Sequence, residues 1–122
     1  MVHQVRVIAG RGRGKRIGFP TINMEIPEGL GATHGIYAGW IYINEKKYEA
    51  AVHYGPVPTF SETVATLEAY LIDGVVEARG EVGVELVAHM RDIKLFLSAD
   101  ELAQAIRDDV ADVRKILKVH RA

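Results

Sequence analysis

The chain has 122 residues, of which 48% are hydrophobic and 25% are charged, with a formal net charge of −1 at pH 7. This length and balance predict a single globular domain over residues 1–122, and they exclude a low-complexity chain or a strongly basic nucleic-acid-binding protein. The sequence contains no cysteine, which excludes disulfides, thiolate catalysis and cysteine-based zinc sites. No apolar run has the length of a signal peptide or membrane span, so we expect a cytoplasmic protein that does not enter a membrane. We also expect a monomer.

Alternating apolar and polar residues, with many β-branched side chains, predict short strands over much of the chain. Asn44-Glu45-Lys46 predicts a hairpin turn between two of them. Residues 23–33 and 53–62 contain glycine and proline and are expected to form loops or bulged segments. Within one strand, Glu68 and Tyr70 share a face that is opposite to their apolar neighbours. The predicted strands cover residues 2–9, 35–43, 47–52, 64–72 and 81–89.

The hydrophobic period changes near the C-terminus, where the pattern predicts a helix. Ser98 and Glu101 have the spacing of a capping box, which marks the start of a helix. An apolar stripe follows and requires a partner, which we expect to be the outside of the sheet. The elements together predict a mainly β fold, a small closed or nearly closed antiparallel barrel with one C-terminal amphipathic helix packed on it. The stripe consists of Leu102, Ile106, Val110, Val113 and Leu117.

Residues 11–23 combine glycines, cations and two oxygen-bearing side chains. Glycines let a ligand approach the backbone, and exposed N–H groups with nearby cations suit a phosphate. Thr21 and Asn23 lie two positions apart, so in an extended segment their oxygens share a face and suit a hard cation such as Mg²⁺. Gly14-Lys15 is followed by Arg16, so the segment is not a P-loop, and its glycines do not have G-x-G-x-x-G spacing. From the residues alone, a solvated turn that leads into a strand is the alternative to a phosphate site.

Five motifs, taken in order, resemble those of the riboflavin kinase family, whose members make FMN from riboflavin and ATP. The resemblance runs from about Val5 to Leu117, which is nearly the whole chain, and the shared order and spacing make it specific. The motifs are Gly18-Phe19-Pro20-Thr21-Ile22-Asn23, Gly35-Ile36-Tyr37-Ala38-Gly39, Gly55-Pro56-Val57-Pro58-Thr59-Phe60, Leu67-Glu68-Ala69, and a closing segment with Arg91, Phe96 and Ser98-Ala99-Asp100-Glu101-Leu102.

The resemblance implies a six-stranded Greek-key barrel with a C-terminal helix, and an enzyme that uses ATP and Mg²⁺ or another divalent cation to convert riboflavin into FMN, with ADP as the second product. It implies that Thr21 and Asn23 hold the metal ion with the nucleotide phosphates. It also implies that Glu68 is the general base for the ribityl 5′-hydroxyl and that Arg91 lies in the segment that folds over the flavin. The residues that it places along the ATP phosphates are Gly12, Gly14, Lys15, Gly18, Pro20 and Thr21.

The sequence departs from the family pattern in several places. Of the family's Asp-Phe-x-x-Asp-Leu-Tyr-Gly turn, residues 73–80 keep only the first and last. His53-Tyr54 stands where the family has Asn-Ile, and Tyr70 replaces a histidine. These departures motivate an alternative, a flavin- or nucleotide-binding barrel module with reduced catalysis. The FMN adenylyltransferase domain of bacterial homologues is not expected.

Two further interpretations concern the basic and histidine residues. The cations of residues 11–16 suggest a third interpretation, a small barrel that binds RNA. An aromatic content of 7% leaves few side chains on which bases could stack, so nucleic-acid binding is disfavoured. The five histidines do not have metal-ligand spacing, and they are interpreted as surface or incidental residues.

Overall fold

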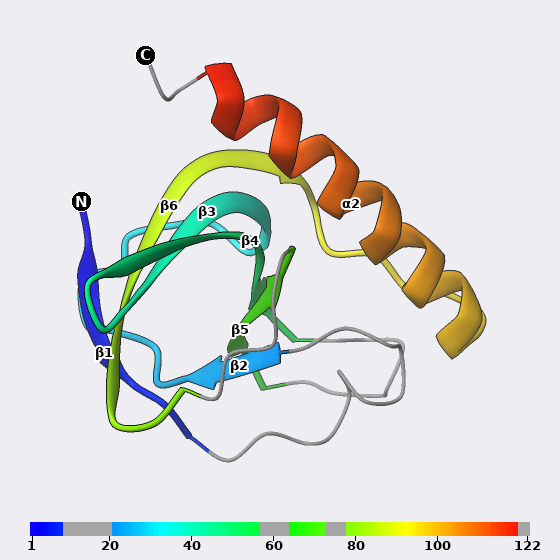
Figure 1. Cartoon of the computed structure of the whole chain (residues 1–122). Helices are drawn as coiled ribbons and strands as arrows, with labels where there is room; N and C mark the ends of the chain where they lie inside the picture. The colour runs from blue at the N-terminus through cyan, green and yellow to red at the C-terminus, as the bar shows by residue number, and fades with distance from the viewer. Residues whose placement is uncertain (9–20, 57–63, 73–77, 120–122) are drawn as a thin grey trace.

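Six antiparallel strands form one sheet that curls into a barrel, and a C-terminal helix packs across its outside (Figure 1). The computed structural model describes residues 1–8, 21–56, 64–72 and 78–119. The elements are β1 (His3–Arg6), β2 (Thr21–Met24), β3 (Gly35–Ile43), β4 (Lys46–Gly55), β5 (Thr66–Leu71), β6 (Glu81–Arg91) and α2 (Ala99–Val119).

The strands lie in the order β1-β6-β3-β4-β5-β2. β3, β4 and β5 follow one another as neighbours, and β6 returns to the free side of β3, which is the Greek-key arrangement. The two outermost strands approach each other, because Val7 bridges to Met24 and the Ile8 N–H donates to the Asn23 carbonyl at 2.8 Å. The sheet therefore curls until its edges meet, and the predicted Greek-key barrel with a terminal helix is confirmed.

The β3–β4 hairpin turns at Asn44 and Glu45, which have φ values of 48° and 71°. Two consecutive residues with positive φ make the type I′ turn that matches the right-handed twist of the flanking strands. Ile43 pairs with Lys46, so the turn is one residue shorter than predicted.

β4 continues through Gly55, and the prediction of a loop from His53 onward is wrong for its first three residues. The physical reason is that β5 offers a partner at each position, with His53 opposite Glu68 and Tyr54 opposite Leu67. A glycine at the end of this run signals a turn locally, but cross-strand pairing overrides that signal. The predicted loop over residues 23–33 is likewise wrong at Asn23 and Met24, which belong to β2 because β5 pairs with the whole length of that strand.

Side chains of the sheet alternate between the barrel interior and the outer face. Glu68 and Tyr70 lie on the opposite face from Leu67, Ala69 and Leu71, which belong to the interior core, as predicted. The interior core also includes Ile22, Met24, Ile41, Val52, Val82 and Val84.

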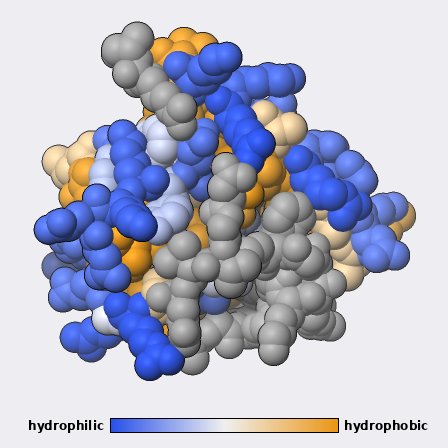
Figure 2. Space-filling view, viewed as in Figure 1, coloured by the Kyte–Doolittle hydropathy of each residue, from blue (hydrophilic) through white to orange (hydrophobic). Residues whose placement is uncertain are grey.

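α2 covers part of the outer face, where it packs against Ala38, Trp40, Ala51 and Tyr70. The predicted cap is present: the Glu101 N–H donates to Ser98 Oγ at 3.1 Å, and Glu101 Oε2 accepts from the Leu97 N–H at 2.9 Å. The visible surface of the helix is mostly hydrophilic (Figure 2). No helix within the described ranges is long and apolar enough to cross a membrane.

The apolar stripe of α2 differs from the prediction at one position. Leu102, Ile106, Val113 and Leu117 are buried as expected, whereas Val110 is only half-buried. The fully buried position between Ile106 and Val113 is taken by a carboxylate, Asp109.

Candidate active site

One row of side chains crosses five strands on the outer face of the barrel. Each residue of the row lies directly opposite the next on the neighbouring strand, and such cross-strand partners point to the same face of a sheet. From β2 through β5, β4 and β3 to β6, the row consists of Asn23, Glu68, His53, Ile36 and Arg91.

Three of the predicted site residues meet at one end of this row. Asn23 pairs with Glu68, and Thr21 pairs with Tyr70 two positions along the same two strands. Because residues two apart in a strand share a face, the Thr21 hydroxyl, the Asn23 amide and the Glu68 carboxyl all project from the same side of the β2–β5 pair. Directly opposite positions have Cβ atoms about 5 Å apart, so Asn23 and Glu68 reach the same small volume.

Glu68 is an unusual residue for the face of a small barrel because its side chain is only 1% exposed. Carboxylates are rarely buried to this degree, and buried ionisable groups are concentrated at functional sites, which supports a role for Glu68 beyond packing. The alternation of apolar and polar residues along the strand predicted that Glu68 points outward. It did not predict that the surrounding structure buries the Glu68 side chain.

Five of the predicted phosphate-binding residues lie outside the described residues, so their role stays a prediction. They are Gly12, Gly14, Lys15, Gly18 and Pro20.

A pocket lies between the outer face of the sheet and α2, next to the row. Glu68 neighbours two of its lining residues, His53 across the strands and Tyr70 along β5. The pocket is narrow, with a cavity volume of about 20 Å³. The lining residues include Ile36, Ala51, His53, Tyr70, Arg91, Phe96, Leu102, Ile106 and Asp109.

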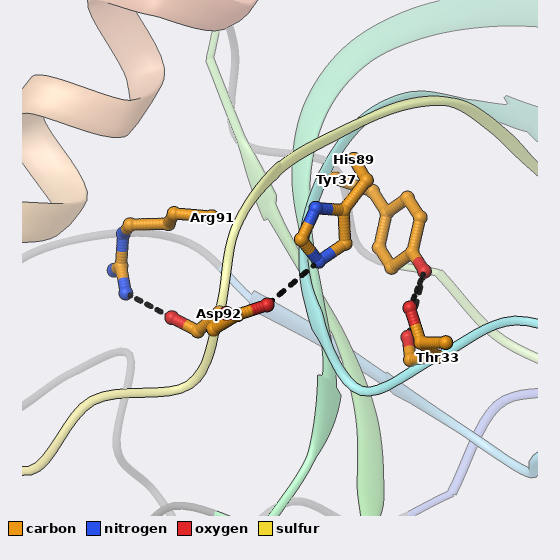
Figure 3. Close-up of polar contacts among 5 residues, drawn as sticks. All are labelled: Thr33, Tyr37, His89, Arg91 and Asp92. Carbon is orange, nitrogen blue, oxygen red and sulfur yellow. Dashed lines mark hydrogen bonds and ion pairs between the residues drawn. The ribbon is translucent and has the colours of Figure 1, made fainter.

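Arg91 forms the β6 wall of this pocket, and its guanidinium is held by α2. Its Nε donates to Asp109 Oδ1 at 3.0 Å and one terminal nitrogen donates to Asp109 Oδ2 at 2.8 Å. A second terminal nitrogen donates to the Asp92 carbonyl at 3.2 Å (Figure 3). Sequence reasoning missed Asp109, although a carboxylate at a stripe position of an amphipathic helix was a detectable signal.

His53 is a second residue that sequence reasoning misjudged. It is 7% exposed, lies between Glu68 and Ile36 in the row, and has its Nε2 at 2.9 Å from the Gly55 carbonyl oxygen. The interpretation of the histidines as surface or incidental residues is therefore wrong for His53. Its position depends on the extension of β4, which the glycine and prolines after it concealed.

A separate polar cluster lies where β3 begins and β6 ends (Figure 3). The Tyr37 hydroxyl donates to the Thr33 carbonyl at 2.6 Å, and the Tyr37 ring meets the His89 ring edge-on with centroids 5.2 Å apart. His89 Nε2 lies 3.3 Å from Asp92 Oδ1. Figure 3 shows Arg91 extending toward α2 while His89 turns to Tyr37, so the end of β6 places neighbouring polar residues in two different surroundings.

The fold belongs to the class of small Greek-key barrel domains. It carries a hydroxyl, an amide and a buried carboxyl on one face, beside a pocket under a helix. Comparison with known proteins gives the particular family. The family model described as "Flavokinase: Riboflavin kinase" matches residues 2–117, and the chain belongs to the riboflavin kinase family.

Individual relatives agree with this assignment. Human riboflavin kinase is 30% identical over an aligned length of 122, and the alignment covers 93% of this chain and 79% of the human protein. The bifunctional riboflavin kinase/FMN adenylyltransferase of Escherichia coli is 32% identical over an aligned length of 108, and the alignment covers 86% of this chain and 34% of that protein. The Buchnera aphidicola protein of the same name is 31% identical over an aligned length of 120, and the alignment covers 95% of this chain and 38% of that protein. The chain thus spans little more than a third of the bifunctional relatives.

A solved structure also has this fold. The crystal structure described as the macrolide-efflux protein of Streptococcus pneumoniae superposes with a TM-score of 0.79 at 29% sequence identity. The superposition covers 93% of this chain and 38% of that one.

Proposed function

We propose that this chain transfers the γ-phosphoryl group of ATP to the 5′-hydroxyl of riboflavin, which gives FMN and ADP. Membership of the riboflavin kinase family supports the reaction class. The observation that carries the proposal is the direct opposition of Asn23 and Glu68, because it joins a candidate metal ligand to a candidate base across a single strand pair.

Glu68 is the general base of the proposed reaction. Its carboxylate takes the proton of the 5′-hydroxyl as the hydroxyl oxygen bonds to the γ-phosphorus and the bond from that phosphorus to the β–γ bridging oxygen breaks. Phosphoryl transfer depends mainly on positioning and charge neutralisation, with one carboxylate to orient the alcohol. A buried side chain on a strand paired on both sides supplies that fixed orientation.

Thr21 and Asn23 are proposed to hold Mg²⁺ or another divalent cation. A hydroxyl and an amide oxygen are hard ligands, and two of them leave coordination positions for phosphate oxygens and water, as Mg²⁺ requires. When bound, the cation neutralises charge that builds up on the transferred phosphoryl group. The glycines, Lys15 and Pro20 of residues 12–20 are proposed to lie along the ATP phosphates, where backbone N–H groups and a cation suit a polyanion.

The pocket under α2 is proposed to receive the flavin ring. Its walls combine Ile36, Phe96 and Leu102 with the Arg91 guanidinium, which suits a flat, uncharged ring. Neighbouring strands are about 4.8 Å apart, so Arg91 lies four spacings, or roughly 19 Å along the sheet, from Asn23. An elongated substrate along this row has its reactive end beside Glu68 and its ring toward Arg91.

A turnover assay tests the proposal. The purified chain is incubated with ATP, Mg²⁺ and riboflavin, and FMN and ADP are separated by chromatography and quantified. We expect the two products in equal amounts and only when the divalent cation is present. Riboflavin binding without any FMN would overturn the kinase proposal and favour a binding module.

A further inference from the structure

The C-terminal helix contributes one charged residue to the candidate pocket. Asp109 is 5% exposed, lies in the apolar stripe of α2, and lines the pocket. A leucine or alanine at this position would complete the stripe without the free-energy cost of burying a carboxylate. Packing of α2 therefore does not explain why a charged residue occupies this position.

The buried carboxylate pairs with the guanidinium of Arg91, and the geometry of this pair is specific. Both carboxylate oxygens accept, at 3.0 Å and 2.8 Å, so the two planar groups lie edge to edge. Such bidentate pairs are strong and fix the orientation of the guanidinium plane. The Arg91 guanidinium carbon also lies 5.6 Å from the centre of the Phe96 ring, which lines the same pocket.

We propose that Asp109 is a positioning residue for the flavin pocket, which holds the Arg91 guanidinium in a fixed plane against the pocket wall and neutralises its charge. This inference rests on the proposed function, because it takes the pocket as the site of the flavin ring. In this proposal, α2 contributes to the flavin site a residue that orients Arg91. A neutralised, oriented guanidinium presents a flat edge to an uncharged ring, and it does not create a charged pocket that would favour an anion.

A purely structural role for Asp109 makes a different prediction. If the ion pair only anchored α2 to β6, its loss would lower the thermal midpoint, and Arg91→Lys, which keeps a charge opposite Asp109, would largely retain both the midpoint and the riboflavin affinity. If Asp109 positions Arg91, its loss weakens riboflavin binding selectively, because the proposed nucleotide site lies at the opposite end of the row.

The neighbouring residue offers a matched control. Asp108 lies on the exposed side of the same helix, where its Oδ1 accepts from Gln104 at 3.1 Å. Asp108→Asn and Asp109→Asn thus make the same chemical change one residue apart, and only the second removes the charge that faces Arg91.

The experiment measures riboflavin binding by fluorescence quenching without ATP, the KM values for riboflavin and ATP, and the thermal midpoint of each variant. We expect Asp109→Asn to raise both the riboflavin Kd and its KM about tenfold, since a hydrogen bond to a charged group is lost, with the KM for ATP changed less than about twofold. Asp109→Glu should recover part of the affinity, and Asp108→Asn should match the wild type. An unchanged riboflavin Kd in Asp109→Asn, or equal changes in both KM values, overturns the inference.

Arg91→Lys keeps the proposal testable if Asp109→Asn does not fold. Lysine retains the charge but cannot make the bidentate pair, so we expect the same selective rise in riboflavin Kd. The kinase proposal and the role of Asp109 are tested by different measurements. Wild-type protein that binds riboflavin without forming FMN overturns the kinase proposal, but the binding measurements still test the role of Asp109. Wild-type protein that does not bind riboflavin overturns both.

Discussion

Asn23 on β2 lies directly opposite Glu68 on β5, and the two side chains project from the same face of the barrel. These residues are 45 positions apart in the chain, so only the pairing of the two strands brings them together. The pairing places an amide side chain opposite a carboxylate that is almost fully removed from solvent. Most of the expected behaviour of the site follows from this relationship.

Replacement of Glu68 by glutamine should abolish most turnover without unfolding the protein. The amide has nearly the same shape but cannot take the proton of the hydroxyl, so we expect FMN formation to fall by roughly 10²- to 10⁴-fold. The rate is measured with saturating ATP and riboflavin. Glu81→Gln, at an exposed position of β6, serves as the control and should retain the wild-type rate. A Glu68→Gln protein that keeps its rate would remove Glu68 from the mechanism.

Replacement of Asn23 by alanine should weaken the response to Mg²⁺ more than the affinity for riboflavin. The proposed metal ligand is lost, whereas Arg91, which forms the β6 wall of the pocket, lies at the other end of the row. We expect the Mg²⁺ concentration for half-maximal activity to rise about tenfold or more, which corresponds to about 1.4 kcal/mol. The check is a Mg²⁺ titration of turnover beside a riboflavin binding curve. Equal losses in both would contradict a metal role.

Tyr42 should make the stability of the barrel depend on alkaline pH. Burial, the hydrogen bond from its hydroxyl to Glu85 Oε1 at 2.7 Å and the Glu85 charge together raise the pKa of Tyr42 to about 12. The folded-state pKa thus lies above the ordinary value of 10.0, so folding favours the protonated phenol. Its contribution is complete below pH 10 and is lost as the pH rises toward 12.

Denaturant unfolding at pH 8 and at several values between pH 10 and pH 12 tests this expectation. The Tyr42→Phe variant should be less stable than the wild type by about 1 kcal/mol at pH 8, and the gap should narrow as the pH rises, because phenylalanine does not titrate. If the difference in unfolding free energy between the wild type and Tyr42→Phe stayed constant across this pH range, the titration of the Tyr42 hydroxyl would not affect stability.

Gly35 should be intolerant of alanine because its neighbours occupy the space of a side chain. An added Cβ would lie 2.7 Å from the Arg91 carbonyl oxygen and would also collide with the His89 ring. The backbone at the end of β6 would have to shift, so we expect a loss of stability of about 1–3 kcal/mol and weaker riboflavin binding through Arg91. Gly29→Ala is the contrast: its φ is 71°, but no atom of the described residues lies within 4 Å of the added Cβ, so we expect only the backbone cost of about 1 kcal/mol. A Gly35→Ala protein as stable as the wild type would contradict the close approach.

Local sequence signals were sufficient where the governing forces act over a few residues. The cap of Ser98 and Glu101, the turn at Asn44 and the alternation around Glu68 all depend on neighbours in the chain, and each was predicted close to its observed form. The motif order added the family and hence the Greek-key barrel. The segment from His53 to Gly55 was misassigned because its strand state depends on β5, which lies more than ten residues further on.

By itself, the amino-acid sequence determined that this protein is a mainly β barrel with a capped amphipathic helix, and which hydroxyl, amide and carboxyl side chains are candidates for chemistry. The tertiary structure decided which of them meet. Strand register placed Asn23 against Glu68 and brought His53 into the same row, and helix packing placed Asp109 against Arg91. The physical reason is that register and packing are set by contacts between residues far apart in the chain, whose partners no local pattern specifies.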